Sequence, residues 1–187
     1  KLKPSSSNML IEIDFKAAEP SLLYNVMHDT RVKDVYGMFN LKHERSKIKL
    51  AVISSLYGGT KNKIKSLTGI DYKDIELIKS QLNVSALKKY LIDQSKENGY
   101  IQNLYGRHVY GENNLINYWL QSSAADFAMS CFYQFAKEHQ VNVKAIIHDA
   151  IIFECTRKQY DKIKIIDYLT DPITNISLYV DKKIIAK

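Results

Sequence analysis

Two aspartates stand where this chain is best placed to do chemistry. Asp14 ends one apolar run, and Asp149 lies between two others. Aspartates at such places often only form turns or caps. Two carboxylates brought together on one sheet repel each other, however, and need a cation between them. Mg²⁺ is the natural cation for such oxygen ligands. A paired site of this kind can hold the attacking and leaving oxygens of a phosphoryl displacement.

A second group combines positive charge with an aromatic residue. Arg45 and Lys49 are four residues apart in a helical pattern, and Tyr57-Gly58 follows them. Like charges at this spacing repel by roughly a few tenths of a kcal/mol, so an anion would offset them. A solvated basic face is one interpretation. A bound polyphosphate is the sharper one, because Arg is a planar fork and Lys a mobile point charge.

A third group consists of amides. Asn117 and Gln121 share one face at the start of a long helical pattern, and Ala124-Ala125 permit close packing. Amides can bind the minor-groove acceptors that all base pairs present in nearly the same places. The alternative is that Asn117 caps the helix and Gln121 is an ordinary surface residue.

The elements that position these groups follow from the apolar pattern. Strands are predicted at residues 9–15, 99–105, 143–147, 151–155 and 176–180. Helices are predicted at about 20–26, 44–56, 71–98 (one or two helices), 117–137 and 158–169. Strands at both ends with helices between them indicate an α+β fold, in which helices cover an antiparallel sheet.

Composition bounds the class of protein. The 187 residues are 45% apolar and 25% charged, which suits one domain or a domain with a subdomain. Two cysteines cannot form a disulfide framework, so a reducing compartment is expected. No apolar run approaches the ~18 residues of a membrane span, so no membrane partner is expected. A net charge of +7 together with 13 Tyr favours nucleic-acid binding.

The order of these groups resembles the family A DNA polymerases, the bacterial DNA polymerase I type. Asp14, with Glu19 five positions later, resembles the first motif of the family. Arg45, Lys49 and Tyr57-Gly58 match the second motif at full spacing.

Three further segments carry the same resemblance. Residues 99–107 resemble the strand and turn that follow the fingers. Asn117 and Gln121, with the Ser-Ala-Ala-Asp that ends at Asp126, match the next helix. Ile147-His148-Asp149, followed by Ile-Ile-Phe-Glu, matches the third motif. The resemblance covers nearly the whole chain.

The resemblance implies a role for each of these residues. Asp14 and Asp149 would be catalytic and would hold two Mg²⁺ ions, with the Phe15 carbonyl as a further ligand. A dNTP would bind at four residues. Arg45 and Lys49 would grip its triphosphate, Tyr57 would pack near the templating position, and Glu19 would help to exclude a 2′-hydroxyl. Primer-template DNA would contact Arg107, Asn117, Gln121 and His148.

The chain also departs from the family pattern. The family usually has an acid directly after the aspartate of its third motif, where this chain has Ala150. An aromatic usually follows four residues after the lysine of the second motif, where this chain has Ile53. The first departure would alter the response to metal ions, and the second removes a stacking surface against the nascent base pair. The Lys/Ile/Asn/Tyr-rich composition would suit a compact viral or phage polymerase.

The family resemblance also sets the expected division of the chain. Residues 1–38 and 99–187 would form the palm, and residues 39–98 would form a helical fingers insertion. The thumb and the exonuclease-like domain are expected on a separate polypeptide or in a longer native chain. The expected location is the cytoplasm of a bacterium or of a phage-infected host.

The sequence therefore predicts the palm and fingers of a family A DNA polymerase, which adds a dNTP to a primer 3′-hydroxyl. One alternative is a catalytically weak or inactive DNA-binding accessory subunit, which Ala150 and Ile53 favour. Another is a metal-dependent nuclease that uses the same acid pair, although this leaves the spacing of Arg45, Lys49 and Tyr57 unexplained.

Overall fold

A computed structural model describes residues 3–5 and 8–186 of the chain. The backbone divides into two compact units. One unit consists of Lys1–Ala18 and Ala124–Lys187, and the other of Glu19–Ser123. The palm and fingers boundaries expected at residues 38 and 98 stay a prediction.

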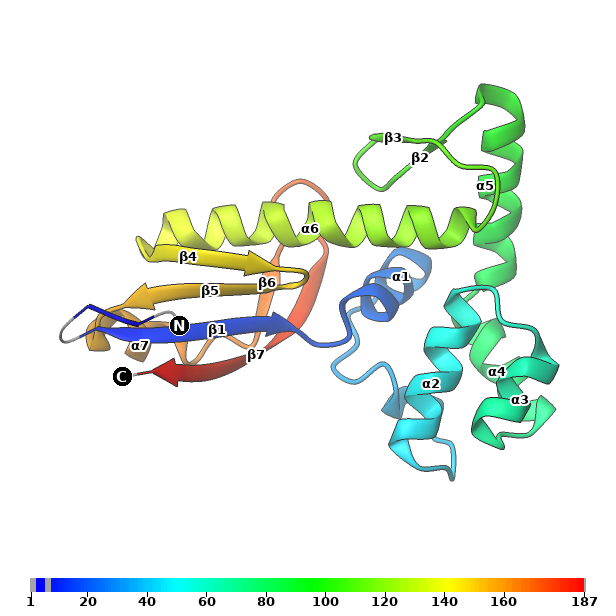
Figure 1. The fold of residues 1–187 in the computed structure, drawn as a ribbon, viewed down its shortest axis with the longest axis horizontal. Coiled ribbons are helices and arrows are strands. Elements are labelled where there is room, and N and C mark those ends of the chain that lie inside the picture. The colour runs from blue at the N-terminus through cyan, green and yellow to red at the C-terminus, as the bar shows by residue number, and fades with distance from the viewer. Residues whose placement is uncertain (1–2, 6–7, 187) are drawn as a thin grey trace. The chain divides into compact units, whose positions relative to one another are not determined.

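The first unit is built on an antiparallel sheet with the strand order β4-β5-β1-β7-β6 (Figure 1). Its strands are β1 (Met9–Phe15), β4 (Asn142–Ile147), β5 (Ala150–Cys155), β6 (Tyr168–Thr170) and β7 (Ser177–Ala186). The central strand β1 has Leu10, Ile11 and Ile13 completely buried. Burial on both faces explains why this strand is a nearly continuous apolar run rather than an alternating one. The expected α+β class with an antiparallel sheet is confirmed.

Aromatic packing fixes the long helix α6 (Leu115–His139) on this sheet. The rings of Phe127 and Phe132 both lie 5.2 Å from the ring of Phe15, measured between centroids. One to two turns later, Phe135 packs 5.3 Å from Phe153 of β5. Rings at these separations add to the stabilisation from burial alone. The end of β1, next to Asp14, is therefore anchored by the helix.

The helix predicted at 158–169 is too long. Helix α7 (Arg157–Ile163) begins at a Thr156 capping box and ends six residues early. Leu169 lies instead in β6, where it is buried opposite Leu178 of β7. Pairing with β7 therefore determines the conformation at the end of this segment, despite its local helical pattern. The last strand is correspondingly longer than expected, because β7 continues six residues beyond Val180.

The second unit is mainly helical. It contains α1 (Ala18–His28, from Glu19 onward), the 3₁₀ turn Gly37–Phe39, α2 (Arg45–Leu56), α3 (Lys61–Thr68), α4 (Tyr72–Gln81) and α5 (Val84–Asn98). Helices α2, α3 and α4 pack together around buried Ile48, Ile64 and Ile75 (Figure 1). The prediction for 71–98 is confirmed as two helices, whereas α3 was not expected. The strand predicted at 99–105 shrinks to β2 (Ile101–Gln102), which pairs with β3 (His108–Val109).

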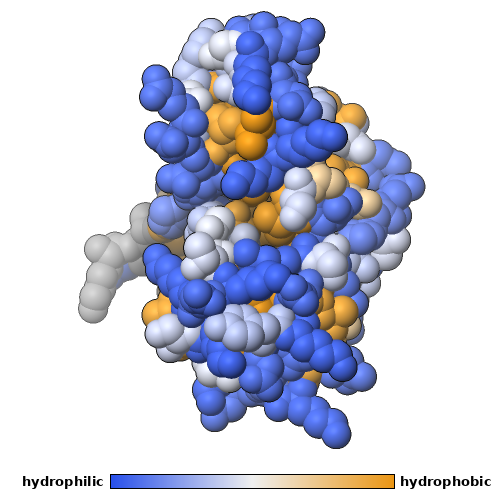
Figure 2. All heavy atoms as spheres, turned by 90° about the vertical axis from the view of Figure 1, so that its right-hand side faces the viewer, coloured by the Kyte–Doolittle hydropathy of each residue, from blue (hydrophilic) through white to orange (hydrophobic). Residues whose placement is uncertain are grey.

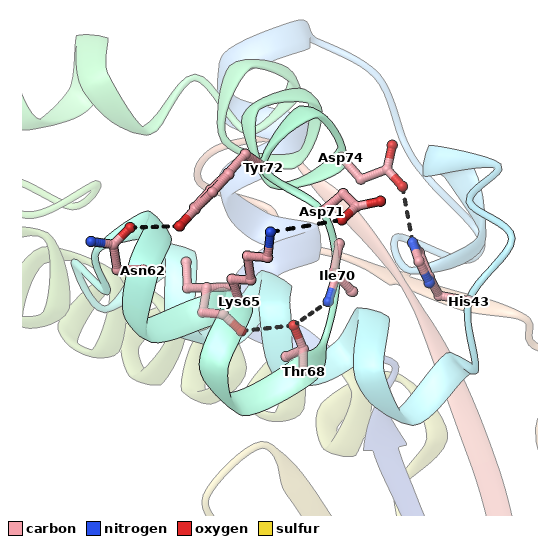
Figure 3. Close-up of polar contacts among 9 residues, drawn as sticks. His43, Asn62, Lys65, Thr68, Ile70, Asp71, Tyr72 and Asp74 are labelled. Atoms are coloured by element: carbon pink, nitrogen blue, oxygen red, sulfur yellow. Dashed lines mark hydrogen bonds and ion pairs between the residues drawn. The ribbon is translucent and has the colours of Figure 1, made fainter.

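A set of polar contacts holds the connection between α3 and α4 (Figure 3). The Thr68 hydroxyl donates to the Ile64 carbonyl and accepts from the Ile70 amide, at 2.7 and 3.2 Å. Across the two helices, the Tyr72 hydroxyl donates to Asn62 at 2.9 Å. These bonds give the Ile70 amide an acceptor between the two helices and tie the start of α4 to α3.

Hydrophilic side chains cover most of the face seen in Figure 2, and hydrophobic ones show there only in patches. Among the residues that the structure describes, no helix is both long and apolar enough to cross a membrane.

Candidate functional site: an acid pair and a basic helix

The acid pair lies where β1 ends beside the β4–β5 turn. Asp14 pairs in register with Ala150, the first residue of β5. The Phe15 amide donates to the Asp149 carbonyl at 3.1 Å. His148 and Asp149 form the two-residue turn, and His148 takes a left-handed φ of 55°. Such a conformation is uncommon for a residue other than glycine. The structure thus brings Asp149 of this turn close to Asp14 at the end of β1.

Negative charge accumulates at Asp14. Burial, followed by the charges of Asp149, Glu12 and Asp181, raises the pKa of Asp14 to about 6. Each of these effects disfavours the ionised carboxylate. A divalent cation at this point would reverse the balance, because it favours the charged form.

Asp181 is the acid that the sequence analysis missed. It lies directly opposite Asp14 in the register between β1 and β7. The predicted last strand stopped at Val180, one residue before it. Extending the alternation of β7 through Val180 would have placed an acid beside the first strand. Asp181 is largely exposed and pairs with Lys16 at 2.8 Å.

The acid pair offers Mg²⁺ two carboxylate ligands. Within the described ranges, no group of three or more His, Cys, Asp or Glu side chains is arranged to hold a metal ion. Two carboxylates are nevertheless a sufficient protein contribution, because Mg²⁺ in nucleotide-processing sites keeps several waters and takes further ligands from substrate phosphates. Asp14 and Asp149 are the residues that would hold it, with the Phe15 carbonyl as the further ligand that the motif resemblance implies.

On the basic helix α2, one of the two cations is paired with an acid of the chain itself. Arg45 forms a bidentate ion pair with Asp34, with N–H···O distances of 2.6 and 2.8 Å. This pairing holds the pKa of Asp34 below its usual range. The guanidinium carbon also lies 5.4 Å from the centre of the Tyr36 ring. The offsetting anion expected for Arg45 is therefore a side chain of this chain, eleven residues upstream.

Lys49 is the cation that remains available on α2. It is exposed one turn after Arg45. Within residues 3–5 and 8–186, no acid forms an ion pair with it. A flexible ammonium group without a partner can reach an anionic ligand with little cost.

Tyr57 joins three helices of the second unit. Its hydroxyl donates to the carboxylate of Glu19 in α1, and the side chain of Gln121 in α6 also hydrogen-bonds to it. Burial and the bond to Glu19 raise the pKa of Tyr57 to about 12, so it stays a neutral donor at physiological pH. Because these residues lie far apart in the sequence, their contacts could not be predicted from local patterns.

The four residues expected to contact DNA differ in their exposure and in their hydrogen-bond partners. Arg107 donates to the Ser122 carbonyl of α6 at 3.2 Å. Gln121 is engaged with Tyr57, and His148 is exposed in its turn. Asn117 is not a helix cap, because α6 begins two residues earlier. Its amide oxygen is buried and has no hydrogen-bond partner among the described residues.

Comparison with known proteins identifies a similar fold but no related sequence. No family model matches the chain, and no curated protein matches its sequence. A solved structure that does match is the POL domain of Pol1 from M. smegmatis, in complex with a DNA primer-template and a dNTP. The TM-score is 0.67 at 14% sequence identity, over 97% of this chain and 40% of the other. The chain therefore spans less than half of that domain, and it has a polymerase-like fold.

Proposed function

We propose that the chain is the palm and fingers part of a family A DNA polymerase and that it catalyses template-directed nucleotidyl transfer. The primer 3′-hydroxyl would give its proton to a solvent water molecule and attack the α-phosphate of a dNTP. A new phosphodiester bond would form as the bond to pyrophosphate breaks. The observation that carries the proposal is the acid pair, in which Asp14 at the end of β1 lies beside Asp149 of the β4–β5 turn and the surroundings of Asp14 raise the pKa of its carboxyl.

Each group has a part in the proposed reaction. Asp14 and Asp149 would hold Mg²⁺, which would supply charge neutralisation at the reacting oxygens. Lys49 would bind the triphosphate directly, whereas Arg45 would do so after releasing Asp34. Glu19, held by Tyr57, would line the sugar position. These assignments follow the motif resemblance, and the polymerase-like fold supports them.

A DNA-binding accessory subunit without activity is the second candidate. The pairing of Arg45 with Asp34 favours it, because a neutralised arginine is not poised for a triphosphate. Ala150 favours it as well, since it leaves the third motif one acid short. Retention of both Asp14 and Asp149 opposes it.

Primer extension under single-turnover conditions separates the two candidates. The chain is used in excess over a primer-template, so that weak DNA affinity does not hide the chemical step. The wild type should add the templated nucleotide in the presence of Mg²⁺. Asp149→Asn should slow extension by about 100-fold or more, because several kcal/mol of charge stabilisation are lost.

Asp161→Asn is the matched control. Asp161 is an exposed acid of the same unit that pairs with Lys164 at 2.8 Å. Its amide variant should extend primers at the wild-type rate. Absence of templated extension by the wild type would leave the accessory role, and release of nucleotides from unprimed DNA would indicate a nuclease instead.

A further inference from the structure

Asp14 has an acid beside it on one neighbouring strand and an alanine on the other. In the strand register it lies opposite Asp181 of β7 and opposite Ala150 of β5. Figure 1 shows these strands side by side, with β1 between β5 and β7. Residues directly opposite each other on antiparallel strands point to the same face of a sheet. Asp181, Asp14 and Ala150 therefore form one row across three strands, on one face.

The row carries an acid only on the β7 side of Asp14. Direct neighbours in a register have their Cβ atoms about 4.5–5.5 Å apart, so a carboxylate at Ala150 or at Asp181 is similarly placed to act on Asp14. Asp181 is one of three acids whose charges act on Asp14. Another of them, Glu12, lies opposite Lys183 in the same register, so a cation stands beside it. Asp181 thus provides on the β7 side the negative charge that Ala150 does not provide on the β5 side.

An ion pair with Lys16 leaves the charge of Asp181 available to another cation. The Lys16 ammonium lies 2.8 Å from the Asp181 carboxylate, whose side chain is 72% exposed. An exposed pair of this kind contributes little free energy, because water screens it and both side chains lose conformational freedom. A cation held at the acid pair can therefore compete with Lys16 for Asp181.

Asp181 lies outside the set of direct metal ligands. Within the described residues, no three acid, histidine or cysteine side chains are arranged to hold one metal ion together. Mg²⁺ in nucleotide-processing sites keeps several of its waters, and these waters are hydrogen-bond donors. A carboxylate next to the site can accept from them, and partners in this outer layer contribute to metal affinity.

We propose that Asp181 is a positioning residue of the acid pair, which accepts a hydrogen bond from a water of the hydrated Mg²⁺ held by Asp14 and Asp149. It thereby takes the place of the acid that the third motif lacks at Ala150. This rests on the proposed function, in which the acid pair holds Mg²⁺. Because Asp181 acts through that water, its effect is on the affinity for the metal ion and not on the chemical step.

The test is the binding of Mn²⁺ alone to the full chain, followed by the loss of the EPR signal of free Mn²⁺. Mn²⁺ prefers the same carboxylate and water ligands as Mg²⁺, so added Mg²⁺ should displace it. No DNA or nucleotide is present. The wild type should bind Mn²⁺ saturably near neutral pH, and Asp149→Asn should abolish this binding. Absence of saturable binding to the wild type would overturn the proposal.

Asp181→Asn and Asp161→Asn form a matched pair. Each replaces an exposed acid of the first unit that pairs with a lysine at 2.8 Å. Asp181→Asn should weaken Mn²⁺ binding by about 10-fold, the lower end of the effect of outer-layer partners, whereas Asp161→Asn should leave the affinity unchanged. An affinity of Asp181→Asn equal to that of the wild type, or an equal loss in both variants, would contradict the role of Asp181.

Two further variants distinguish a lost charge from a disturbed sheet. Lys16→Met removes the cation that competes for Asp181, so it should tighten Mn²⁺ binding. Adding Ala150→Asp to Asp181→Asn returns an acid to the row beside Asp14, so the double variant should recover the lost affinity. A structural defect at Asp181 would persist in the double variant. The proposal is wrong if Lys16→Met does not tighten binding or if the double variant does not recover it.

The binding assay is independent of catalysis, so the two proposals can fail separately. If the wild type does not extend primers while Asp181→Asn still weakens Mn²⁺ binding, the proposed function alone is wrong. If the wild type extends primers and Asp181→Asn binds Mn²⁺ as the wild type does, the role of Asp181 alone is wrong. In primer extension, Asp181→Asn should raise the Mg²⁺ concentration that gives half the maximal rate and leave the rate at saturating Mg²⁺ near the wild-type value.

Discussion

The acid pair in the first unit and the basic face of α2 in the second differ in how their charges are balanced within the chain. Arg45 is neutralised within the chain, because Asp34 holds it in a bidentate pair. Asp14 is surrounded by further acids, and the pKa of its carboxyl rises to about 6. One region is internally balanced, and the other is left with uncompensated charge.

The difference indicates which region would gain more from an added ion. Self-neutralised Arg45 gains little from an added anion until the Asp34 pair opens. The crowded carboxylates gain at once from an added cation, because like charges close together disfavour ionisation. In the proposed reaction, the acid pair would therefore take up Mg²⁺ readily, whereas nucleotide binding at Arg45 would compete with Asp34.

The largest expected effect in the basic region is at Lys49, the cation without an internal partner. Lys49→Ala should raise the nucleotide KM or lower kcat by about 10- to 150-fold, since a charge-assisted contact contributes about 1.5–3 kcal/mol. Lys47→Met is the control, because Lys47 on the same helix lies 3.9 Å from Glu44. Single-turnover nucleotide titration measures both variants. An effect of Lys49→Ala on DNA affinity alone would place Lys49 on the duplex instead.

Removing the Tyr57 hydroxyl should have a smaller effect. Tyr57→Phe keeps the ring but frees Glu19 from its hydrogen bond. Discrimination between dNTP and NTP substrates should fall by about 2- to 12-fold, because one net hydrogen bond contributes about 0.5–1.5 kcal/mol. The ratio of kcat/KM for the two substrates measures it. Tyr72→Phe is the control, since Tyr72 donates to Asn62 rather than to Glu19. Unchanged discrimination in Tyr57→Phe would separate Glu19 from sugar selection.

Releasing Arg45 from Asp34 should tighten nucleotide binding, whereas the loss of Lys49 should weaken it. Asp34→Asn weakens the pair with Arg45, which is largely exposed and so contributes at most about 1 kcal/mol. Apparent dNTP affinity should tighten by up to about fivefold as the competition disappears. Nucleotide titration of the variant tests this. Weaker dNTP binding would instead show that Asp34 positions Arg45 for the ligand.

Glu154 and Asp14 lie in the same sheet, but their carboxyl pKa values shift in opposite directions. Its buried carboxylate accepts from the Ser5 amide at 2.6 Å and from Asn8 at 3.0 Å, and pairs with Lys144 at 2.7 Å. The bond with Lys144, followed by those from Ser5, lowers its pKa from 4.5 to about 2. The ionised form is thus favoured in the folded state.

A depressed carboxyl pKa stabilises the fold above the unfolded value and loses this effect as the pH falls. The stability contributed by Glu154 should therefore be lost between pH 4.5 and about 2. Glu154→Gln should show a lower Tm at neutral pH and a flatter decline across this window. Thermal melts over an acid series measure it, with Asp93→Asn in the second unit as a control. Parallel melting curves for Glu154→Gln and the wild type would contradict the assigned contacts.

The strands and helices that carry the motifs could be predicted, because their patterns are local. The run from Met9 to Phe15 reads as a buried strand, and β1 has those bounds. The turn at Asp149 follows from the two apolar runs around it. Helix α3 was missed because only two of its eight residues, Ile64 and Leu67, are apolar, which leaves too few positions to define a helical period.

Long-range pairings account for what could not be predicted. Asp34 meets Arg45 through a loop without regular periodicity, and Tyr57 meets Glu19 across 38 residues. Asp181 reaches Asp14 through strand register, which depends on tertiary pairing rather than on local pattern. Sequence spacing thus identified Asp14, Arg45 and Tyr57, but not the residues that they meet in the fold.

Thermal unfolding with and without millimolar Mg²⁺ tests most directly whether the acid pair is a cation site. Near neutral pH, Mg²⁺ should raise the Tm of the wild type. Without metal, Asp14→Asn should already melt above the wild type, because it removes a charge that its surroundings oppose, and Mg²⁺ should add little to it. Asp161→Asn, which loses its pair with Lys164, should instead melt at or below the wild type and keep the full response to Mg²⁺. An Asp14→Asn variant that melts below the metal-free wild type and responds to Mg²⁺ as the wild type does would contradict the account.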